Sequence, residues 1–229
     1  RAAAASPGAS RSRSSALIKE AIEHIKDGDV IMVGGFLANG TPELLIDALV
    51  ESGKKDLTLI CNDTSFVDRG VGKLVVTKQF KKIIASHVGT NRETGNQMNS
   101  GETEVILTPQ GTLAEQVRAG GYGLGGVLTP TGVGTDVEKG KEKITIDGKE
   151  YLLEKPLRAN VALLYAHKVD TFGNMYFHGS GVNFNPLMAT ASDVVIVQSP
   201  TIVEKGEIHQ DDVKVSGIFV DYIVEGGNK

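Results

Sequence analysis

The sequence predicts an α/β fold in which a mostly parallel open sheet has helices on both faces in its N-terminal part. Three observations predict it. Short runs that are apolar throughout alternate with amphipathic segments, glycines stand at the ends of those runs, and no apolar run is long enough to span a membrane. Strands that are apolar on both faces need cover on both sides, which favours a parallel sheet between helices. The C-terminal part adds elements of mixed or antiparallel character.

The N-terminal half supplies the parallel sheet. From Ser15 apolar residues recur at helical spacing, and Asp27-Gly28 ends this first helix. Residues 30–33 form a buried strand between glycine-containing segments. Thr41 is the expected N-cap of the second helix, with Pro42 in its first position, and Gly53 closes it. The remaining elements are strands at 57–61, 83–88 and 105–108 and a helix at 111–119.

The C-terminal half begins with a hairpin signal. Residues 144–146 and 151–153 alternate around Asp147-Gly148, a sequence that favours a two-residue hairpin turn. Further strands are predicted at 161–166, 194–197 and 218–224, and Asn185-Pro186 begins a short helix that ends at Ala191. The glycine-rich segment 120–134 contains Gly121-x-Gly123-x-x-Gly126, which has the glycine spacing of a dinucleotide-binding motif but not its structural context. A helix precedes it instead of a strand, so we expect a ligand-covering loop or a chain reversal.

Residues 1–15 differ from the rest of the chain. They comprise only Ala, Ser, Arg, Gly and Pro, so this segment has no acid and no large apolar side chain. It cannot bury enough surface to order itself, and we expect a disordered leader or tag before a domain at 16–229. A transit peptide is the alternative, because arginine, serine and the lack of acids are typical of one.

Charge and cysteine content exclude several classes of protein. The formal net charge is −4, whereas nucleic-acid and anionic-membrane binders need a basic surface. The single cysteine, Cys61, excludes a disulfide framework. No pair of the five histidines has metal-binding helical spacing, so no metal site is expected; they are His24, His87, His167, His178 and His209.

Besides the glycine-rich segment 120–134, three places could hold a ligand, because ligands of open α/β sheets bind at the carboxyl ends of strands. The first follows strand 30–33, where glycines would let a ligand approach the backbone and a helix N-terminus favours an anion; its residues are Gly34, Gly35, Phe36, Leu37, Ala38, Asn39 and Gly40. A tight turn without a ligand is the alternative. Asn62 offers an amide donor or forms an Asx-turn, and Gln110 offers a second amide or caps a helix. None of these places contains an evident nucleophile or base.

These motifs resemble the α (A) subunits of family I coenzyme A transferases, most closely those acting on acetate, butyrate and acetoacetate. The similarity spans residues 16–223. It rests on Gly34-Gly35-Phe36-x-x-x-Gly40-x-Pro42, Asn62-Asp63, Thr108-Pro109-Gln110-Gly111-Thr112, Thr129-Pro130-Thr131-Gly132 and Asn183-Phe184-Asn185-Pro186.

The resemblance implies a reaction and a partner. A glutamate attacks an acyl-CoA thioester, and CoA then passes through a glutamyl-CoA thioester to another carboxylate; CoA is a substrate and no cofactor is needed. The family's glutamate lies in a Ser-Glu-Asn-Gly segment of a β subunit. Glu102 and Glu207 do not match that segment. We therefore expect no catalytic nucleophile here, a β-subunit partner in a heterotetramer with two copies of each chain, and a cytoplasmic location.

The resemblance also assigns roles to the candidate residues. Residues 34–40 would bind CoA, and Asn62 and Gln110 would face the reacting thioester and acyl group. Asp63 departs from relatives that carry a second asparagine, so it receives no donor role. The acyl group stays open, because one methylene in a pocket is worth only ~1–3 kcal/mol.

Two other functions remain open at this point. A sugar-phosphate isomerase-like protein would use the glycine loops for phosphate, although these loops contain no basic side chain placed for it. A non-catalytic subunit would bind acyl-CoA as an effector without reacting.

Overall fold

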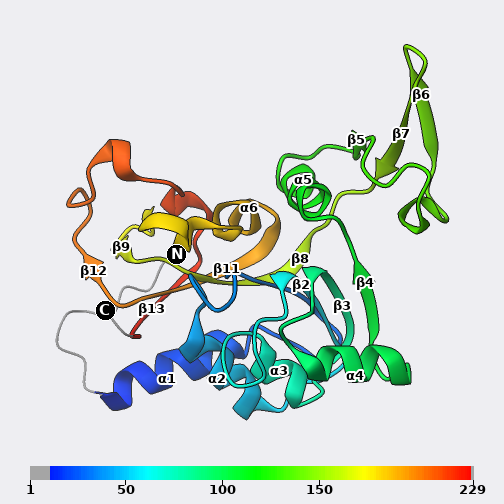
Figure 1. Cartoon of the computed structure of the whole chain (residues 1–229). Helices are drawn as coiled ribbons and strands as arrows, with labels where there is room; N and C mark the ends of the chain where they lie inside the picture. The colour runs from blue at the N-terminus through cyan, green and yellow to red at the C-terminus, as the bar shows by residue number, and fades with distance from the viewer. Residues whose placement is uncertain (1–10, 228–229) are drawn as a thin grey trace.

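The fold is built on a seven-stranded sheet in which every pair of neighbouring strands is parallel (Figure 1). The structure is a computed structural model and describes residues 11–227. The strand order is β13-β11-β8-β1-β2-β3-β4. In chain order the strands are β1 (Val30–Val33), β2 (Leu57–Asp63), β3 (Phe80–His87), β4 (Glu104–Leu107), β8 (Ala159–Tyr165), β11 (Ser192–Ser199) and β13 (Tyr222–Glu225).

Helices cover both faces of the sheet, as the sequence predicts (Figure 1). One face packs against α1 (Arg11–Ile22), α2 (Glu43–Ser52) and α3 (Gly72–Val76), and α4 (Arg92–Ser100) lies beside α3. The other face packs against α5 (Gln110–Gly121) and α6 (Asn185–Thr190). Strand β1 illustrates why two cores form: Ile31 and Val33 point to the first set of helices, whereas Met32 points to the second.

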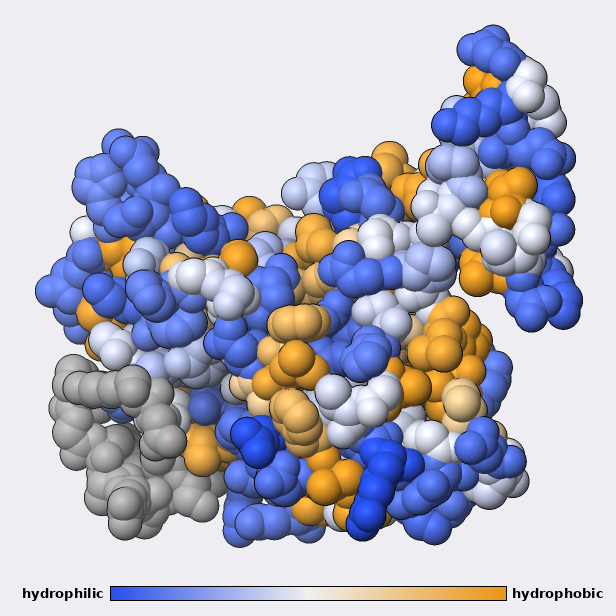
Figure 2. Space-filling model, in the orientation of Figure 1, coloured by the Kyte–Doolittle hydropathy of each residue, from blue (hydrophilic) through white to orange (hydrophobic). Residues whose placement is uncertain are grey.

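Two small sheets in the C-terminal part confirm the predicted mixed and antiparallel additions. The first has the order β10-β9-β12, and the second has the order β5-β7-β6. Their strands are β5 (Val127–Thr129), β6 (Lys143–Ile146), β7 (Lys149–Glu154), β9 (Lys168–Asp170), β10 (Met175–Tyr176) and β12 (Ile202–Val203). Asp147 and Gly148 have φ values of 50° and 77°, as the predicted hairpin turn requires. This hairpin projects from the body as a mostly hydrophilic arm (Figure 2).

Strand β4 lies at one edge of the large sheet and is not fully covered. Ile106 and Leu107 are 37% and 50% exposed. Figure 2 shows an apolar area at the place of this strand. An exposed apolar edge strand can pair or pack with another chain. Between residues 11 and 227 no helix is both long and apolar enough to pass through a lipid bilayer.

The structure differs from the sequence prediction at several elements. Helix α1 begins at Arg11, inside the segment expected to lie outside the fold, while residues 1–10 lie outside the described residues. Helix α2 begins at Glu43, and Thr41 does not cap it. The strand predicted at 218–224 is a 3₁₀ turn, Gly217–Phe219, followed by the shorter β13. The polar helix α4 was missed, although Asn91 caps its N-terminus through bonds from Glu93 N and Thr94 N.

Candidate active site

The glycine segment after β1 forms a tight turn at the carboxyl edge of the sheet. Phe36 and Asn39 exchange two backbone hydrogen bonds of 2.9 Å each, and the two residues between them, Leu37 and Ala38, have φ values of 49° and 67°. This is the geometry of a two-residue turn in which both central residues are left-handed. Because neither residue is glycine, the turn is strained and persists only if its surroundings hold it.

Two asparagines hold the turn from the side of α6. Asn183 accepts a hydrogen bond from Gly35 N at 3.1 Å and donates to Asn39 O at 3.1 Å. Asn185 donates to Gly40 O at 3.1 Å. A Cβ on Gly34 would lie 2.0 Å from Asn185 Oδ1, so this glycine is needed for the contact with Asn185. The Asn183-x-Asn185 motif therefore acts as a clamp on the turn, a role that the sequence did not reveal.

Asp63 holds the same turn from the side of β2. Its Oδ2 accepts a bond from Leu37 N at 3.1 Å, and its Oδ1 accepts one from Ser65 N at 2.8 Å. The side chain is only 3% exposed. Burial raises the pKa of the neighbouring Cys61 thiol well above its usual value, and the charge of Asp63 raises it further. That thiol is therefore not prepared as a nucleophile.

The turn exposes side chains more than it exposes glycine backbone. Phe36 and Leu37 are 48% and 36% exposed, whereas Gly34 and Gly40 are buried. The N-terminus of α2 is also occupied, because Gln198 Oε1 accepts bonds from Leu44 N at 2.9 Å and Leu45 N at 3.3 Å. An anion is thus not needed to satisfy these two N–H groups.

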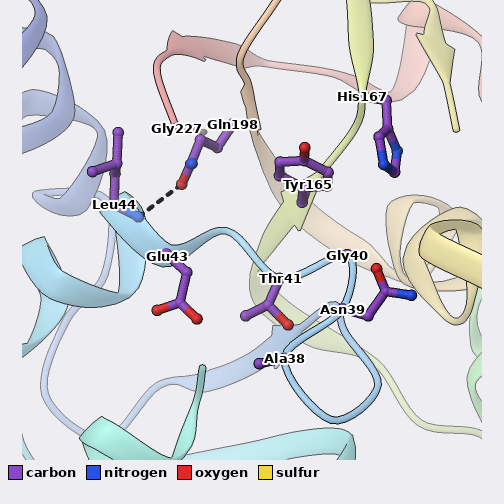
Figure 3. Close-up of a pocket in the computed structure, with 10 residues that line it drawn as sticks. All are labelled: Ala38, Asn39, Gly40, Thr41, Glu43, Leu44, Tyr165, His167, Gln198 and Gly227. Carbon is purple, nitrogen blue, oxygen red and sulfur yellow. Dashed lines mark hydrogen bonds between the residues drawn. The ribbon is translucent and has the colours of Figure 1, made fainter. Parts of the chain in front are cut away.

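A pocket of about 320 Å³ opens beside the turn, between α2 and the carboxyl ends of β8 and β11. Figure 3 shows Thr41 and Glu43 on one side of it and Tyr165 and His167 on the other. The Glu43 carboxylate forms an ion pair with Lys73 at 2.6 Å and accepts a bond from Gly70 N at 2.7 Å. Lys73 also pairs with Asp47, so this one cation faces two carboxylates.

His167 contributes a neutral imidazole to this pocket. Its Nδ1 accepts a bond from His178 N at 3.0 Å, which leaves the proton of the neutral ring on Nε2. Burial lowers the pKa of His167, and the nearby His178 lowers it further. Burial also raises the pKa of the Tyr165 phenol. Both side chains thus act as neutral hydrogen-bonding groups near pH 7.

Asn62 lies in β2 on the face of the sheet that packs against α5. It is 4% exposed. Its Nδ2 donates to Asp63 Oδ2 at 3.1 Å, and the Ser86 hydroxyl lies 3.3 Å from its Oδ1 and donates to its backbone O at 2.6 Å. Among residues 11–227 the second N–H of Nδ2 has no acceptor. Ser86 was not predicted from the sequence.

Gln110 begins α5, directly after β4, and its side chain is exposed. Strands β2 and β4 are separated only by β3, so their ends are about 10 Å apart. Asn62 and Gln110 therefore flank one region of the carboxyl edge, while the pocket at His167 lies on the opposite side of the turn. The structure brings the turn and Asn62 together through Asp63, and it leaves Gln110 farther away.

The turn after β1 has a counterpart after β2 that the sequence analysis did not identify. Phe66 and Arg69 form an isolated antiparallel bridge, as Phe36 and Asn39 do, and Gly70 follows with a φ of 59°. The signal in the sequence is the repeated pattern Phe-x-x-x-Gly. A Cβ on Gly70 would lie 3.4 Å from Ala38 Cβ, so the two turns are in contact.

Comparisons with known proteins bear on this arrangement. The family model for coenzyme A transferase matches residues 16–226. The chain is 55% identical to the acetate CoA-transferase subunit alpha of Escherichia coli K12, over 90% of this chain and 94% of that protein. It is 51% identical to the acetoacetyl-CoA:acetate/butyrate CoA transferase alpha subunit of Clostridium acetobutylicum, over 87% and 92%.

Solved structures with lower identity share the fold. An acyl-CoA transferase of Escherichia coli O157:H7, crystallised as a thioester complex with CoA, has a TM-score of 0.82 at 22% identity. The match covers 93% of this chain, which spans about half (47%) of that longer chain. The glutaconate coenzyme A-transferase of Acidaminococcus fermentans has a TM-score of 0.79 at 18% identity, over 91% of this chain and 74% of that one.

Proposed function

The chain belongs to the coenzyme A transferase family, and from this premise we propose that it is the α subunit of an enzyme acting on short-chain acyl groups. The enzyme moves CoA between acetyl-, butyryl- or acetoacetyl-CoA and a free carboxylate. The names of the two α-subunit relatives, which match at 55% and 51% identity, support these substrates. The geometric observation that carries the proposal is the Asn62 amide, which is held by two neighbours and has one N–H without an acceptor among residues 11–227.

The proposed reaction needs a carboxylate nucleophile on a β subunit. A glutamate oxygen attacks the thioester carbon, and the C–S bond breaks. CoA leaves as a thiolate, and an acyl-glutamyl anhydride remains on the enzyme. The thiolate then attacks the glutamyl carbonyl and releases the first acid, which leaves a glutamyl-CoA thioester. The acceptor carboxylate repeats these steps in reverse. Since one thioester replaces another, this chemistry calls for no metal, nucleotide or redox cofactor.

This chain would bind the substrate and stabilise developing charge. The free N–H of Asn62 would donate to the oxyanion that forms on the thioester, a contact worth ~2.7–4 kcal/mol when a fixed donor is removed. Gln110 would contact the acyl group or the acceptor acid from the start of α5. The turn of residues 34–40 would contact CoA through its exposed side chains, chiefly Phe36, Leu37 and Asn39.

The partner would be a β subunit of similar size in a heterotetramer with two copies of each chain. The word alpha in the names of the relatives supports a partner, and so does the exposed apolar edge at β4. A cytoplasmic location also stays a prediction. An isomerase that binds sugar phosphate is less well supported, because Gln198 occupies the N-terminus of α2 and no basic side chain lies in the turn at 34–40.

Reconstitution tests the proposal and separates it from an effector-binding role. The chain is produced alone, with its β chain, and with a β chain whose Ser-Glu-Asn-Gly glutamate is changed to glutamine. CoA exchange is then measured from acetoacetyl-CoA to acetate and butyrate. We expect exchange only in the complex with intact β chain. A complex that binds acyl-CoA without exchange would indicate an effector-binding subunit. Full exchange by this chain alone would refute the proposal that the β chain supplies the nucleophile.

A further inference from the structure

We propose that Asp63 is a positioning residue for CoA transfer: its carboxylate orients the Asn62 amide and couples that amide to the turn of residues 34–40. The inference rests on the proposed function, because it takes Asn62 as the donor to the thioester. It goes beyond that function by giving a role to the buried carboxylate that lies beside Asn62.

One carboxylate oxygen makes both contacts. Asp63 Oδ2 accepts from Asn62 Nδ2 at 3.1 Å and from Leu37 N at 3.1 Å. Leu37 is one of the two residues at positive φ in the turn. The position of this single oxygen therefore fixes the donor amide and the turn relative to each other.

The contacts around Asn62 also determine which way its amide faces. A carboxylate offers only acceptors, so the side of the amide toward Asp63 must be its nitrogen. The Ser86 hydroxyl, 3.3 Å from Oδ1, lies on the oxygen side. With the nitrogen turned toward Asp63, one N–H is used and the other stays free at the carboxyl edge of the sheet.

The carboxylate is held by hydrogen bonds rather than by a cation. Asp63 is 3% exposed, and within residues 11–227 it forms no ion pair. Its three donors are Leu37 N, Ser65 N and Asn62 Nδ2. A buried carboxylate is tolerated only when such donors converge on it, so the site has a reason to keep all three in place.

The two carboxylate oxygens of Asp63 have different partners, so a substitution that replaces only one of them tests the inference. Oδ1 accepts from Ser65 N at 2.8 Å and closes a local Asx-turn, while Oδ2 makes the two contacts that concern the site. In Asp63→Asn the remaining oxygen can keep the Asx-turn, and the new NH₂ group then faces two donors. The Asn62 amide is expected to turn over, so that its oxygen faces residue 63 and its free N–H is lost from the site.

Asp170 provides a matched control. It is 1% exposed, its Oδ1 accepts from Phe172 N and Asn174 N, and its Oδ2 accepts from the side-chain amide of Asn174 at 2.8 Å. This is a similar buried carboxylate at the end of β9, outside the candidate site. Asp170→Asn therefore reproduces the chemical change without touching Asn62 or the turn.

The experiment is a double-mutant cycle in the reconstituted complex. Removal of one oxyanion donor costs about 10²–10³ in kcat, so Asn62→Ala should lower kcat by at least about a hundredfold. Asp63→Asn should lower kcat at least about tenfold and weaken CoA binding measured by calorimetry. Asn62→Ala/Asp63→Asn should be no slower than Asn62→Ala alone. Asp170→Asn should leave kcat unchanged, while it lowers Tm by about as much as Asp63→Asn does.

The outcomes separate the inference from the proposed function. If Asn62→Ala slows the reaction and Asp63→Asn does not, the positioning role is wrong, and a second asparagine serves here as well as the carboxylate. Fully additive losses in the double variant would also overturn it, because Asp63 would then act independently of Asn62. If Asn62→Ala keeps full kcat, the donor role in the proposed function is the part that fails.

Discussion

A substitution at Gly35 tests how the turn of residues 34–40 is built. Gly35 has a φ of +133°, and a Cβ placed on it would lie 1.9 Å from Thr41 Oγ1. The backbone strain of a non-glycine residue in such a region is about 1–3 kcal/mol, and overpacking adds about 1–3 kcal/mol. We expect Gly35→Ala to lower the free energy of unfolding by about 3 kcal/mol. In a protein of this size that shifts Tm by roughly 6–12 °C.

The assay is thermal unfolding of four variants followed by circular dichroism. Gly53→Ala is the control for strain alone, because Gly53 has a φ of +65° with nothing within 4 Å of the added Cβ. Thr41→Ala removes the oxygen that the new Cβ would meet, so Gly35→Ala/Thr41→Ala should recover part of the loss. The reasoning is refuted if Gly35→Ala is no more harmful than Gly53→Ala, or if Thr41→Ala gives no recovery.

Three further predictions concern other groups at the carboxyl edge. Gln110→Ala should lower kcat of the complex more than it weakens CoA binding, and equal losses in both would argue against a contact made in the transition state. Gln198→Ala should remove the cap of α2 and cost about 1 kcal/mol of stability in chemical denaturation, while an unchanged midpoint would contradict the capping role. The folded-state pKa of His167 is lowered, so its contribution to stability is present above its unfolded pKa of about 6.5 and is lost as the pH falls through the lower folded value. His167→Asn should therefore weaken the fall in stability between about pH 7 and pH 5, and an unchanged slope would exclude this group as a cause.

Local sequence signals were sufficient where neighbouring residues determine the structure. Strand β1 has the predicted bounds, because its four apolar residues stand between a glycine turn and two glycines. The hairpin of β6 and β7 was predicted because Asp147 and Gly148 both tolerate positive φ. The helix α4 was missed because its sequence is polar and only Gln97 and Thr94 are buried in it.

Sequence reasoning did not reach the contacts that hold the site, because they join residues far apart in the chain. Gln198 caps α2 by accepting from Leu44 N, which lies 154 positions earlier in the chain. Asn183 accepts from Gly35 across 148 positions. The motif containing Asn183 was noted only as a family signature, since nothing local indicates where its amides point. The residue types at the site were predictable, and their hydrogen-bond partners were not.

The division of labour between two chains is the central claim, and mapping the covalent intermediate tests it most directly. The reconstituted complex is incubated with acetoacetyl-CoA without an acceptor acid and treated with borohydride, which reduces a glutamyl thioester to an alcohol. Peptides of both chains are then analysed by mass spectrometry. The account predicts a reduced glutamate in the β chain and none among the glutamates of this chain. A reduced glutamate in this chain, at Glu102 or elsewhere, would contradict it.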